Sequence, residues 1–441
     1  MSANESISQT VPDASGLSMR SNFAWVLSGN VVFAACQWGM IVAIAKLGST
    51  LMVGQFSLGV AIATPVLMFT NLYLRGVQAT DARRSYSFGE YFQLRVLMTA
   101  AGLGVIAAAA LFGGHARQTL LVILAVAAAK GIETLSDIHY GLFQLNDRLD
   151  QTARSLMIRG LLSVAAMSAA LYFTHDIVWG CAGVVVVWLT ALFVFDVPRG
   201  RRFGAGPLQR CRLGRQWALA RLALPLGIVT TIAAVNLNMP RYFIHAHLGD
   251  RQLGIYSAMA YATVAVTLVS DSLGHSAIPR LARLYASGKL GEYRGLIAKL
   301  LGVGCVLGMA GLAVAHVAGQ PLLRIFYSPE YASHAGVFTL LMTATAIQCV
   351  ASVFTSGITS TRHFRIQVPL YATMAAGNAL ACAIWIPRAG LKGGAIAMIV
   401  AASLQLLLGA GILGYLATSP ATRRETVETS GITTERWEPG L

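Results

Sequence analysis

The chain has 441 residues, of which 56% are hydrophobic and only 12% are charged, and its mean hydropathy is +0.63. A soluble domain carries roughly 25% charged residues, so this composition excludes a soluble enzyme and predicts a membrane protein with many spans. The net charge of +15 would suggest nucleic-acid binding in a soluble protein. Here the basic residues lie mostly between apolar segments, where they act as topology signals.

The apolar segments predict an all-α polytopic membrane protein, because a spanning helix needs about 20 mostly apolar residues. We expect residues 1–20 to be a disordered cytoplasmic tail, since they are polar and lack the features of a signal peptide. Twelve spans follow, at about 22–46, 54–74, 90–112, 119–144, 155–174, 177–196, 217–246, 253–275, 296–319, 335–359, 366–386 and 393–417. They form two predicted six-helix lobes, 21–196 and 217–418, joined by a basic linker at 197–216 and followed by a cytoplasmic tail at 419–441.

The basic residues predict the orientation of these spans. With the N-terminus inside, 22 of the 33 Lys and Arg residues lie in cytoplasmic segments, six lie in the opposite loops, and five lie within or at the edge of spans. An excess of Lys and Arg marks the cytoplasmic side of a membrane protein. Both termini are therefore predicted to be cytoplasmic.

The two lobes are predicted to be copies of one another. Lys46-Leu47-Gly48 ends the first span and His247-Leu248-Gly249 ends the seventh. Gly54-Gln55-Phe56-Ser57 opens the second span and Gly254-Ile255-Tyr256-Ser257 opens the eighth. Six helices separate equivalent elements, so the repeat has parallel topology, as in transporters whose substrate path runs between two halves.

The fourth span, 119–144, carries three charges on one helical face. Lys130, Glu133 and Asp137 have i, i+3 and i+7 spacing. Lys130 lies roughly 16 Å from the outer end of the helix, at about 1.5 Å per residue, which is too deep to reach the membrane surface. Charges at this depth usually face a bundle interior or a water-filled passage. Glu133 could instead simply neutralise Lys130 as a structural ion pair, and that alternative stays open.

Asp137 has no partner on its own helix, and we expect Arg159 or Arg241 to provide one across the bundle. Four other arginines lie near the cytoplasmic ends of spans and are expected to extend toward lipid headgroups rather than inward. They are Arg75, Arg95, Arg154 and Arg221.

Polar residues also line equivalent faces of the first two helices of each lobe. Asn30 and Gln37 in the first span correspond to Thr231 and Asn238 in the seventh. These four could either line a cavity or form hydrogen bonds that hold helices together. The eighth span adds Tyr261 and Asp271, and the second acidic candidate of the passage is Asp271.

Motifs for enzymatic chemistry are absent from the sequence. There is no GxxxxGK[ST], HExxH or GxSxG motif. The six cysteines have no CxxC spacing, so neither a disulfide framework nor a zinc site is supported. We predict no enzyme activity, no metal and no cofactor.

Three stretches resemble a known group of proteins. Residues 28–57 follow the pattern SGN-x16-LG-x5-G-x-F-S, residues 133–148 read ETLSDIHYGLFQLNDR, and residues 279–284 read PRLARL before Gly288-Lys289. They resemble Wzx-type polysaccharide and O-antigen repeat-unit flippases, the lipopolysaccharide biosynthesis proteins of the multidrug/oligosaccharidyl-lipid/polysaccharide (MOP) exporter superfamily. The resemblance covers about 22–418.

This resemblance implies alternating access by two lobes in the bacterial cytoplasmic (inner) membrane. The implied cargo is an undecaprenyl-pyrophosphate-linked oligosaccharide, moved from the inner to the outer leaflet for O-antigen or exopolysaccharide. Lys130, Arg159 and Arg241 are the candidates for its phosphates. The implied partners include membrane lipids, an H⁺ or Na⁺ counter-ion bound through Glu133, Asp137 or Asp271, and a polysaccharide polymerase, but no nucleic acid. The other predicted substrate-binding residues are Asn30, Gln37, Asn238 and Tyr261.

The sequence leaves two other functions as alternatives. A MATE-like exporter of cationic drugs has the same fold but an opposite cargo charge, which a net-cationic passage disfavours. A membrane glycosyltransferase or polymerase needs a catalytic surface outside the bilayer, and the short outer loops could hardly build one.

Overall fold

The computed structural model describes residues 17–81, 84–205, 213–361 and 364–418, and all regular structure in these ranges is helical. The N-terminal lobe contains α1 (Met19–Leu47), α2 (Thr50–Asn71), α3 (Leu74–Thr80), α4 (Phe88–Phe112), α5 (Arg117–Leu145), α6 (Leu149–Thr174), α7 (Ile177–Ala191), the π-helix η1 (Leu192–Asp196) and α8 (Val197–Arg202). The C-terminal lobe contains α9 (Leu213–Ala286), α10 (Leu290–Phe326), α11 (Pro329–Ala332), α12 (Ala335–Ser360), α13 (Phe364–Ala389) and α14 (Leu391–Thr418). Most of both predicted tails lies outside the described residues.

The predicted twelve spans are confirmed. Eleven helices among the described residues are long and apolar enough to cross a membrane. One of them, Gly214–Ala286, is far too long for one crossing, and its helix is broken at Gly249, where φ is 79° and ψ is 176°. Only glycine adopts such a positive φ without strain. The break divides α9 into the seventh and eighth spans.

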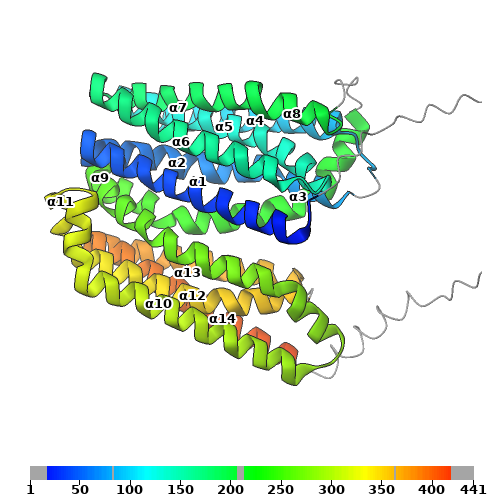
Figure 1. Ribbon diagram of the computed structural model, residues 1–441. Coiled ribbons are helices and arrows are strands. Elements are labelled where there is room, and N and C mark those ends of the chain that lie inside the picture. Colours follow the sequence, from blue (N-terminus) through cyan, green and yellow to red (C-terminus); the bar gives the residue numbers. More distant parts are fainter. Residues whose placement is uncertain (1–16, 82–83, 206–212, 362–363, 419–441) are drawn as a thin grey trace, which may run out of the picture.

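The N- and C-terminal lobes lie one above the other in Figure 1, with α11 at one end of the molecule and α3 and α8 at the other. We call these the α11 end and the α3 end. Helices of the two lobes meet at the α11 end and diverge toward the α3 end. The helix α1 begins, and α14 ends, at the α3 end.

Contacts at the α11 end show the predicted repeat directly. A β-carbon at Gly54 would overlap the backbone carbonyl of Asp250, and a β-carbon at Gly254 would overlap that of Thr50. The two contacts exchange residues 200 positions apart, so they are reciprocal across the two lobes. Absence of a side chain at both glycines lets the start of α2 and the eighth span touch backbone to backbone.

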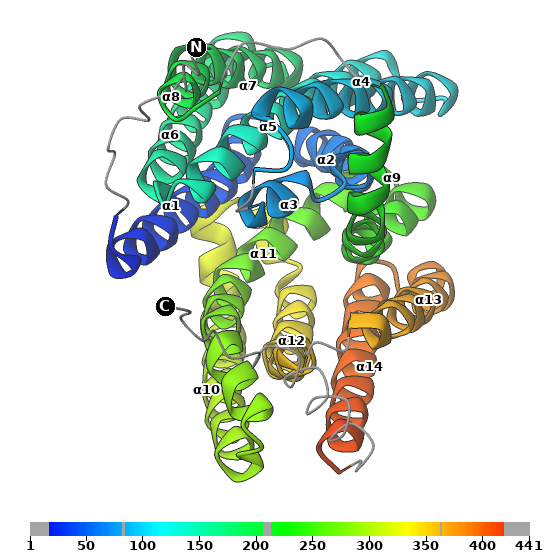
Figure 2. The ribbon, with the colours of Figure 1, turned by 90° about the vertical axis from the view of Figure 1, so that its right-hand side faces the viewer.

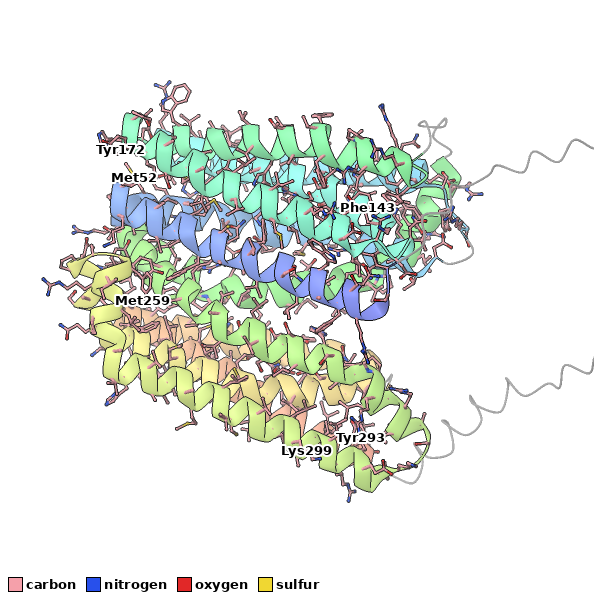
Figure 3. All side chains as sticks on the ribbon, viewed as in Figure 1. Met52, Phe143, Tyr172, Met259, Tyr293 and Lys299 are labelled. Atoms are coloured by element: carbon pink, nitrogen blue, oxygen red, sulfur yellow. The ribbon has the colours of Figure 1, made fainter. Side chains whose placement is uncertain are left out.

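Polar contacts reinforce this seam between the lobes. Trp38 Nε1 donates to the hydroxyl of Tyr327 at 2.7 Å, and the hydroxyl of Tyr242 donates to the carbonyl of Ala61. The labelled Met259 lies beside the same junction in Figure 3 and is fully buried.

The linker region differs from the prediction in two respects. Helix continues through η1 and α8 to Arg202, so the first residues of the predicted linker 197–216 are helical. The start of α9 packs on the N-terminal lobe, with Leu219 buried in a cluster with Leu72 and Tyr91. The first turns of the seventh span therefore tie the two lobes together at the α3 end. Residues 206–212 of the linker lie outside the described ranges.

Candidate transport site between the lobes

The helix α5 supplies the centre of the site because it packs against α2, α4, α6 and α7 inside the N-terminal lobe. The predicted ion pair on this helix is present, with Lys130 Nζ 2.7 Å from Glu133 Oε2. Both side chains are 27% exposed, although they lie in the middle of a spanning helix. A charged pair in this position faces a space inside the protein rather than a packed core.

A small pocket lies in front of Lys130. It has a volume of about 40 Å³ and is lined by Gln37 from α1, Lys130 from α5 and Tyr261 from the eighth span, among others. This is enough space for a water molecule. The pocket brings together three predicted substrate-binding residues from both lobes.

Arg159 lies close to Lys130 but does not open to that space. It is fully buried, its guanidinium lies 4.3 Å from the centre of the Trp188 ring, and its Nη1 donates to Tyr140 at 3.0 Å. Lys130 Nζ lies 5.7 Å from the same ring. Trp188 therefore contacts both cations, in favourable cation–π positions.

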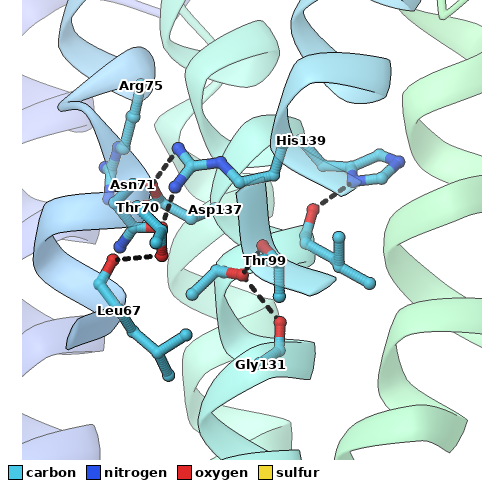
Figure 4. Close-up of polar contacts among 11 residues, drawn as sticks. Leu67, Thr70, Asn71, Arg75, Thr99, Gly131, Asp137 and His139 are labelled. Atoms are coloured by element: carbon cyan, nitrogen blue, oxygen red, sulfur yellow. Dashed lines mark hydrogen bonds and ion pairs between the residues drawn. The ribbon is translucent and has the colours of Figure 1, made fainter. Parts of the chain in front are cut away.

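Asp137 is paired differently from the prediction. Its partners are Arg75 at 3.2 Å and Arg95 at 3.4 Å, not Arg159 or Arg241. Arg95 is fully buried and also donates to the side chain of Asn71. The expectation that Arg95 extends to the headgroups is wrong, because its helix turns it toward a carboxylate and an amide inside the lobe. Figure 4 shows Asn71 and Arg75 grouped around Asp137, with Thr99 further along α4.

In the C-terminal lobe, Arg241 is held by its own helix and by one ring. Its Nη1 donates to Asn238 at 2.6 Å, and its guanidinium lies 5.3 Å from the centre of the Tyr261 ring. Asn238 is buried and donates to the carbonyl of Ala234 at 2.8 Å. Asn238 and Tyr261 thus position Arg241, which is partly exposed. The structure does not bring Asn30 and Asp271 into this group, and both are exposed.

Two acids of the site region were not predicted from the sequence. Asp196 ends the π-helix and is fully buried. Asp250 lies at the seam, with its carboxylate 2.6 Å from His245 and 3.4 Å from the hydroxyl of Thr119. The sequence signal for Asp250 was its place directly after Gly249, at the start of a span in the repeat.

A second, larger cavity lies at the α3 end of the N-terminal lobe. Its volume is about 750 Å³, and its lining includes Asp81, Glu90 and Arg215. Asp81 lies outside the spans, and although partial burial alone would raise its pKa, hydrogen bonds from the backbone of Ser85 and Tyr86 hold the pKa below its ordinary value. Over the described ranges, no three His, Cys, Asp or Glu residues are grouped as a metal site requires.

Comparison with known proteins shows what this arrangement resembles. No family model matches the sequence. The chain is 22% identical over 396 residues to the capsular polysaccharide biosynthesis protein CapF of Staphylococcus aureus, covering 88% of this chain and 98% of CapF. The solved structure of the lipid II flippase MurJ in an inward closed conformation matches with a TM-score of 0.66 and 11% identity, covering 94% of each chain. A mutant of the MATE transporter VcmN of Vibrio cholerae matches with a TM-score of 0.62 and 12% identity, covering 92% of this chain and 96% of that one.

The fold and the polar interior together define a multi-pass membrane protein with the MOP fold, and its structural neighbours are transporters. The predicted resemblance to Wzx-type polysaccharide flippases is supported by the similarity to the capsular polysaccharide biosynthesis protein CapF over nearly its whole length and by the fold shared with MurJ and VcmN.

Proposed function

We propose that the protein is a flippase for a polyprenyl-pyrophosphate-linked oligosaccharide, which it moves from the inner to the outer leaflet of the cytoplasmic membrane. The observation that carries the proposal is the partly exposed Lys130, which lines a pocket with Gln37 and Tyr261 at the junction of the two lobes. The similarity to a capsular polysaccharide biosynthesis protein and the fold shared with a lipid II flippase support the same class of cargo.

The charge of the interior suits an anionic cargo. A diphosphate brings about two negative charges, which need cationic partners in a low-dielectric site. The charged side chains described on and around α5, together with Arg241, comprise five cations and three acids, an excess of two positive charges; they are Arg75, Arg95, Lys130, Arg159, Arg241, Glu133, Asp137 and Asp196. Asp250 lies apart from them at the seam, where it pairs with His245. Lys130 and Arg241 are partly exposed and can reach a cargo in this conformation, whereas Arg159 can do so only after Trp188 moves.

The orientation of the chain supports an outward direction of transport. The excess of Lys and Arg in alternate loops favours a cytoplasmic location for both termini and for the α3 end. The lobes diverge at that end, which suits the entry of a cargo made in the cytoplasm. Each negative charge that moves outward across an inside-negative membrane gains about 2.3 kcal/mol per 100 mV. H⁺ or Na⁺ exchange through Glu133, Asp137 or Asp271 is a second candidate drive, and a polysaccharide polymerase is the expected downstream partner.

A MATE-like exporter of cationic drugs is the second candidate, because the fold also matches VcmN. It requires acidic side chains at the inter-lobe site that are free to bind a cation. Glu133 and Asp137 on the interior face of α5 are each engaged by basic partners, and Asp196 does not line the inter-lobe pocket. This arrangement favours the flippase. A glycosyltransferase or polymerase, which would act as an enzyme, has no support among the structural neighbours.

The proposal is tested by deleting the gene and restoring it with variants. We expect lipid-linked repeat units to accumulate at the cytoplasmic face of the deletion strain, and normal surface glycan in that strain would refute the proposal. Lys130→Ala should fail to restore export, whereas Lys299→Ala is a matched control because Lys299 is exposed on α10 near the α3 end (Figure 3). Equal export by both variants would show that Lys130 does not contact the cargo. Drug resistance that rises on overexpression, with unchanged glycan, would favour the MATE-like alternative.

A further inference from the structure

A buried cluster of polar side chains inside the N-terminal lobe has no assigned role. It contains Asp196 at the end of η1, Ser136 and Tyr140 on α5, and Ser155 and Arg159 on α6. None of these five side chains is more than 2% exposed. It is separate from the small pocket in front of Lys130, whose lining includes none of them.

The cluster holds two opposite charges that form no direct hydrogen bond. Among the described residues, neither carboxylate oxygen of Asp196 has a hydrogen-bond partner of good geometry, and Nε and Nη2 of Arg159 have none either. The hydroxyls of Ser136 and Ser155 and the guanidinium of Arg159 lie close enough to stabilise the carboxylate. A buried carboxylate without partners is costly as an anion, whereas a protonated one becomes a neutral donor. Arg159 offsets part of that cost while it stays in the cluster, and proton binding offsets it when Arg159 is displaced.

An irregular turn of helix places Asp196 inside the lobe. The residues Leu192–Asp196 form a π-helix between α7 and α8, in which the N–H of Val197 donates to the carbonyl of Leu192. Such insertions are rare and occur frequently at functional sites. An apolar residue at 196 would avoid the cost of a buried carboxylate, so the acid is kept at an energetic expense.

The other acids nearby already have cationic partners. Glu133 is paired with Lys130, and Asp137 with Arg75 and Arg95. In the described part of the chain, Asp196 is the acid of the lobe interior that has no ion pair.

The remaining titratable and charged groups around this cluster lie on α5 and α8. Glu133 and Tyr140 on α5 act on Arg159. His139 on α5 lies against Gly200 of α8 and bonds to the carbonyl of Leu135 at 3.1 Å. Arg199 on α8 donates to the side chain of Gln151.

We propose that Asp196 is a proton-binding site whose occupancy is linked, through Arg159, to binding of the anionic part of the cargo. The link to cargo rests on the proposed function. When the phosphates draw Arg159 away from the cluster, the carboxylate of Asp196 takes one proton from water. When they leave and Arg159 returns, that proton goes back to water. The proton neutralises the buried carboxylate that Arg159 no longer faces, and it reduces by one the negative charge whose outward movement the membrane potential favours.

The proton site itself is tested without cargo. The infrared difference spectrum of the purified protein on acidification should contain the C=O band of a protonated buried carboxylic acid. This band should disappear in Asp196→Asn, shift in Asp196→Glu, and persist in the control Glu292→Gln, whose side chain is 62% exposed. An unchanged band in Asp196→Asn would overturn the proposal. Folding of each variant is checked by its elution profile in detergent.

The link to cargo is tested with farnesyl pyrophosphate as the probe. Binding of the probe to the wild-type protein in weak buffer should take up protons. On acidification, the affinity of the wild-type protein should rise by up to about tenfold per pH unit beyond any rise seen in Asp196→Asn. Equal proton uptake by wild type and Asp196→Asn, with binding intact, would overturn the link while leaving the proposed function standing. If the wild-type protein does not bind the probe at any pH, the link and the proposed function both fall, and the infrared result still decides the proton site.

Discussion

The helices α5 and α12 are the fourth helices of the two lobes, and they occupy equivalent places in the repeat. The interior face of α5 carries Lys130, Glu133 and Asp137, whereas α12 (Ala335–Ser360) contains no charged residue. Four polar residues in the half nearer the α3 end are partly exposed at spacings of 4, 3 and 4, which is one helical face; they are Gln348, Ser352, Thr355 and Thr359. The helix α12 lies between α10 and α14 in Figure 2, so this face belongs to the lobe interior.

The two helices differ in where their interior polar groups find partners. The charges on α5 are balanced by residues of other helices, such as Arg75 and Arg95. The threonine hydroxyls on this face of α12 donate within their own helix, since Thr355 donates to the carbonyl of Ala351 at 3.3 Å and Thr359 to that of Thr355 at 2.9 Å. Charges lost from the N-terminal lobe should therefore cost more than polar groups lost from the C-terminal lobe.

The largest effect is expected for Asp137→Ala. It leaves the fully buried Arg95 without a carboxylate, and removing one partner of a buried ion pair costs about 3 kcal/mol. Thermal unfolding in detergent, followed by tryptophan fluorescence, should show a clear loss of stability. The double variant Arg95→Met with Asp137→Leu should recover most of it, because apolar residues replace the pair. A single variant as stable as the wild type would remove the basis of the comparison.

Where the lobes are alike, equal substitutions should act equally. At the seam, Gly54→Ala and Gly254→Ala each force a methyl group into a backbone carbonyl of the other lobe, and overpacking of this kind costs about 2 kcal/mol. Both should shift the protein toward separation at the α11 end. Spin labels at Lys46 and Arg324, which are exposed on opposite lobes, should then report longer distances in a background without native cysteines. A shift in only one of the two variants would contradict the reciprocal packing.

A smaller effect is expected in the C-terminal lobe, at a hydrogen bond between α12 and α14. Thr355→Val removes the hydroxyl that accepts from Gln405 Nε2 at 3.1 Å. Hydrogen bonds between spanning helices contribute about 0.6 kcal/mol on average, so the unfolding free energy should fall by about that amount. The matched change in the N-terminal lobe is Thr134→Val, which removes a 2.8 Å hydrogen bond to Thr99 on α4. Similar small losses in both would show that charge, not polarity, distinguishes the lobes.

Sequence reasoning succeeded where the cause is local. Span lengths depend on runs of apolar residues, and the Lys130–Glu133 pair depends on i, i+3 spacing within one helix. It failed where the partner lies on another helix. Arg95 is near the end of a span and would reach the headgroups if it faced lipid, but the packing of α4 against α2 and α5 turns it inward.

Asp196 was missed for a different reason. A π-helix adds a residue to the turn, so it shifts the phase of every side chain beyond it. Periodicity counted from the start of α7 therefore cannot tell which way residue 196 faces. Like Arg95, Asp196 lies near the end of a span and is fully buried inside the lobe.

The smallest effect is expected at the loops that enter the third helix of each lobe. In the N-terminal lobe, the carboxylate of Asp81 accepts from the backbone N–H of Ser85 at 2.9 Å and of Tyr86 at 3.1 Å, whereas Glu292 at the start of α10 makes only an exposed ion pair with Lys289. Burial alone would raise the folded-state pKa of Asp81, but these hydrogen bonds bring it below the ordinary value of 3.8. The stability that the bonds contribute is therefore complete above pH 3.8, and it is lost as the pH falls through the folded-state pKa. Asp81→Asn should thus be slightly less stable than the wild type at pH 7, and the difference should disappear at an acidic pH below the folded-state pKa. Glu292→Gln should match the wild type at both values, since an exposed pair contributes little. Unfolding curves at the two pH values decide the matter, and an Asp81→Asn deficit that grows in acid would reverse the sign of the argument.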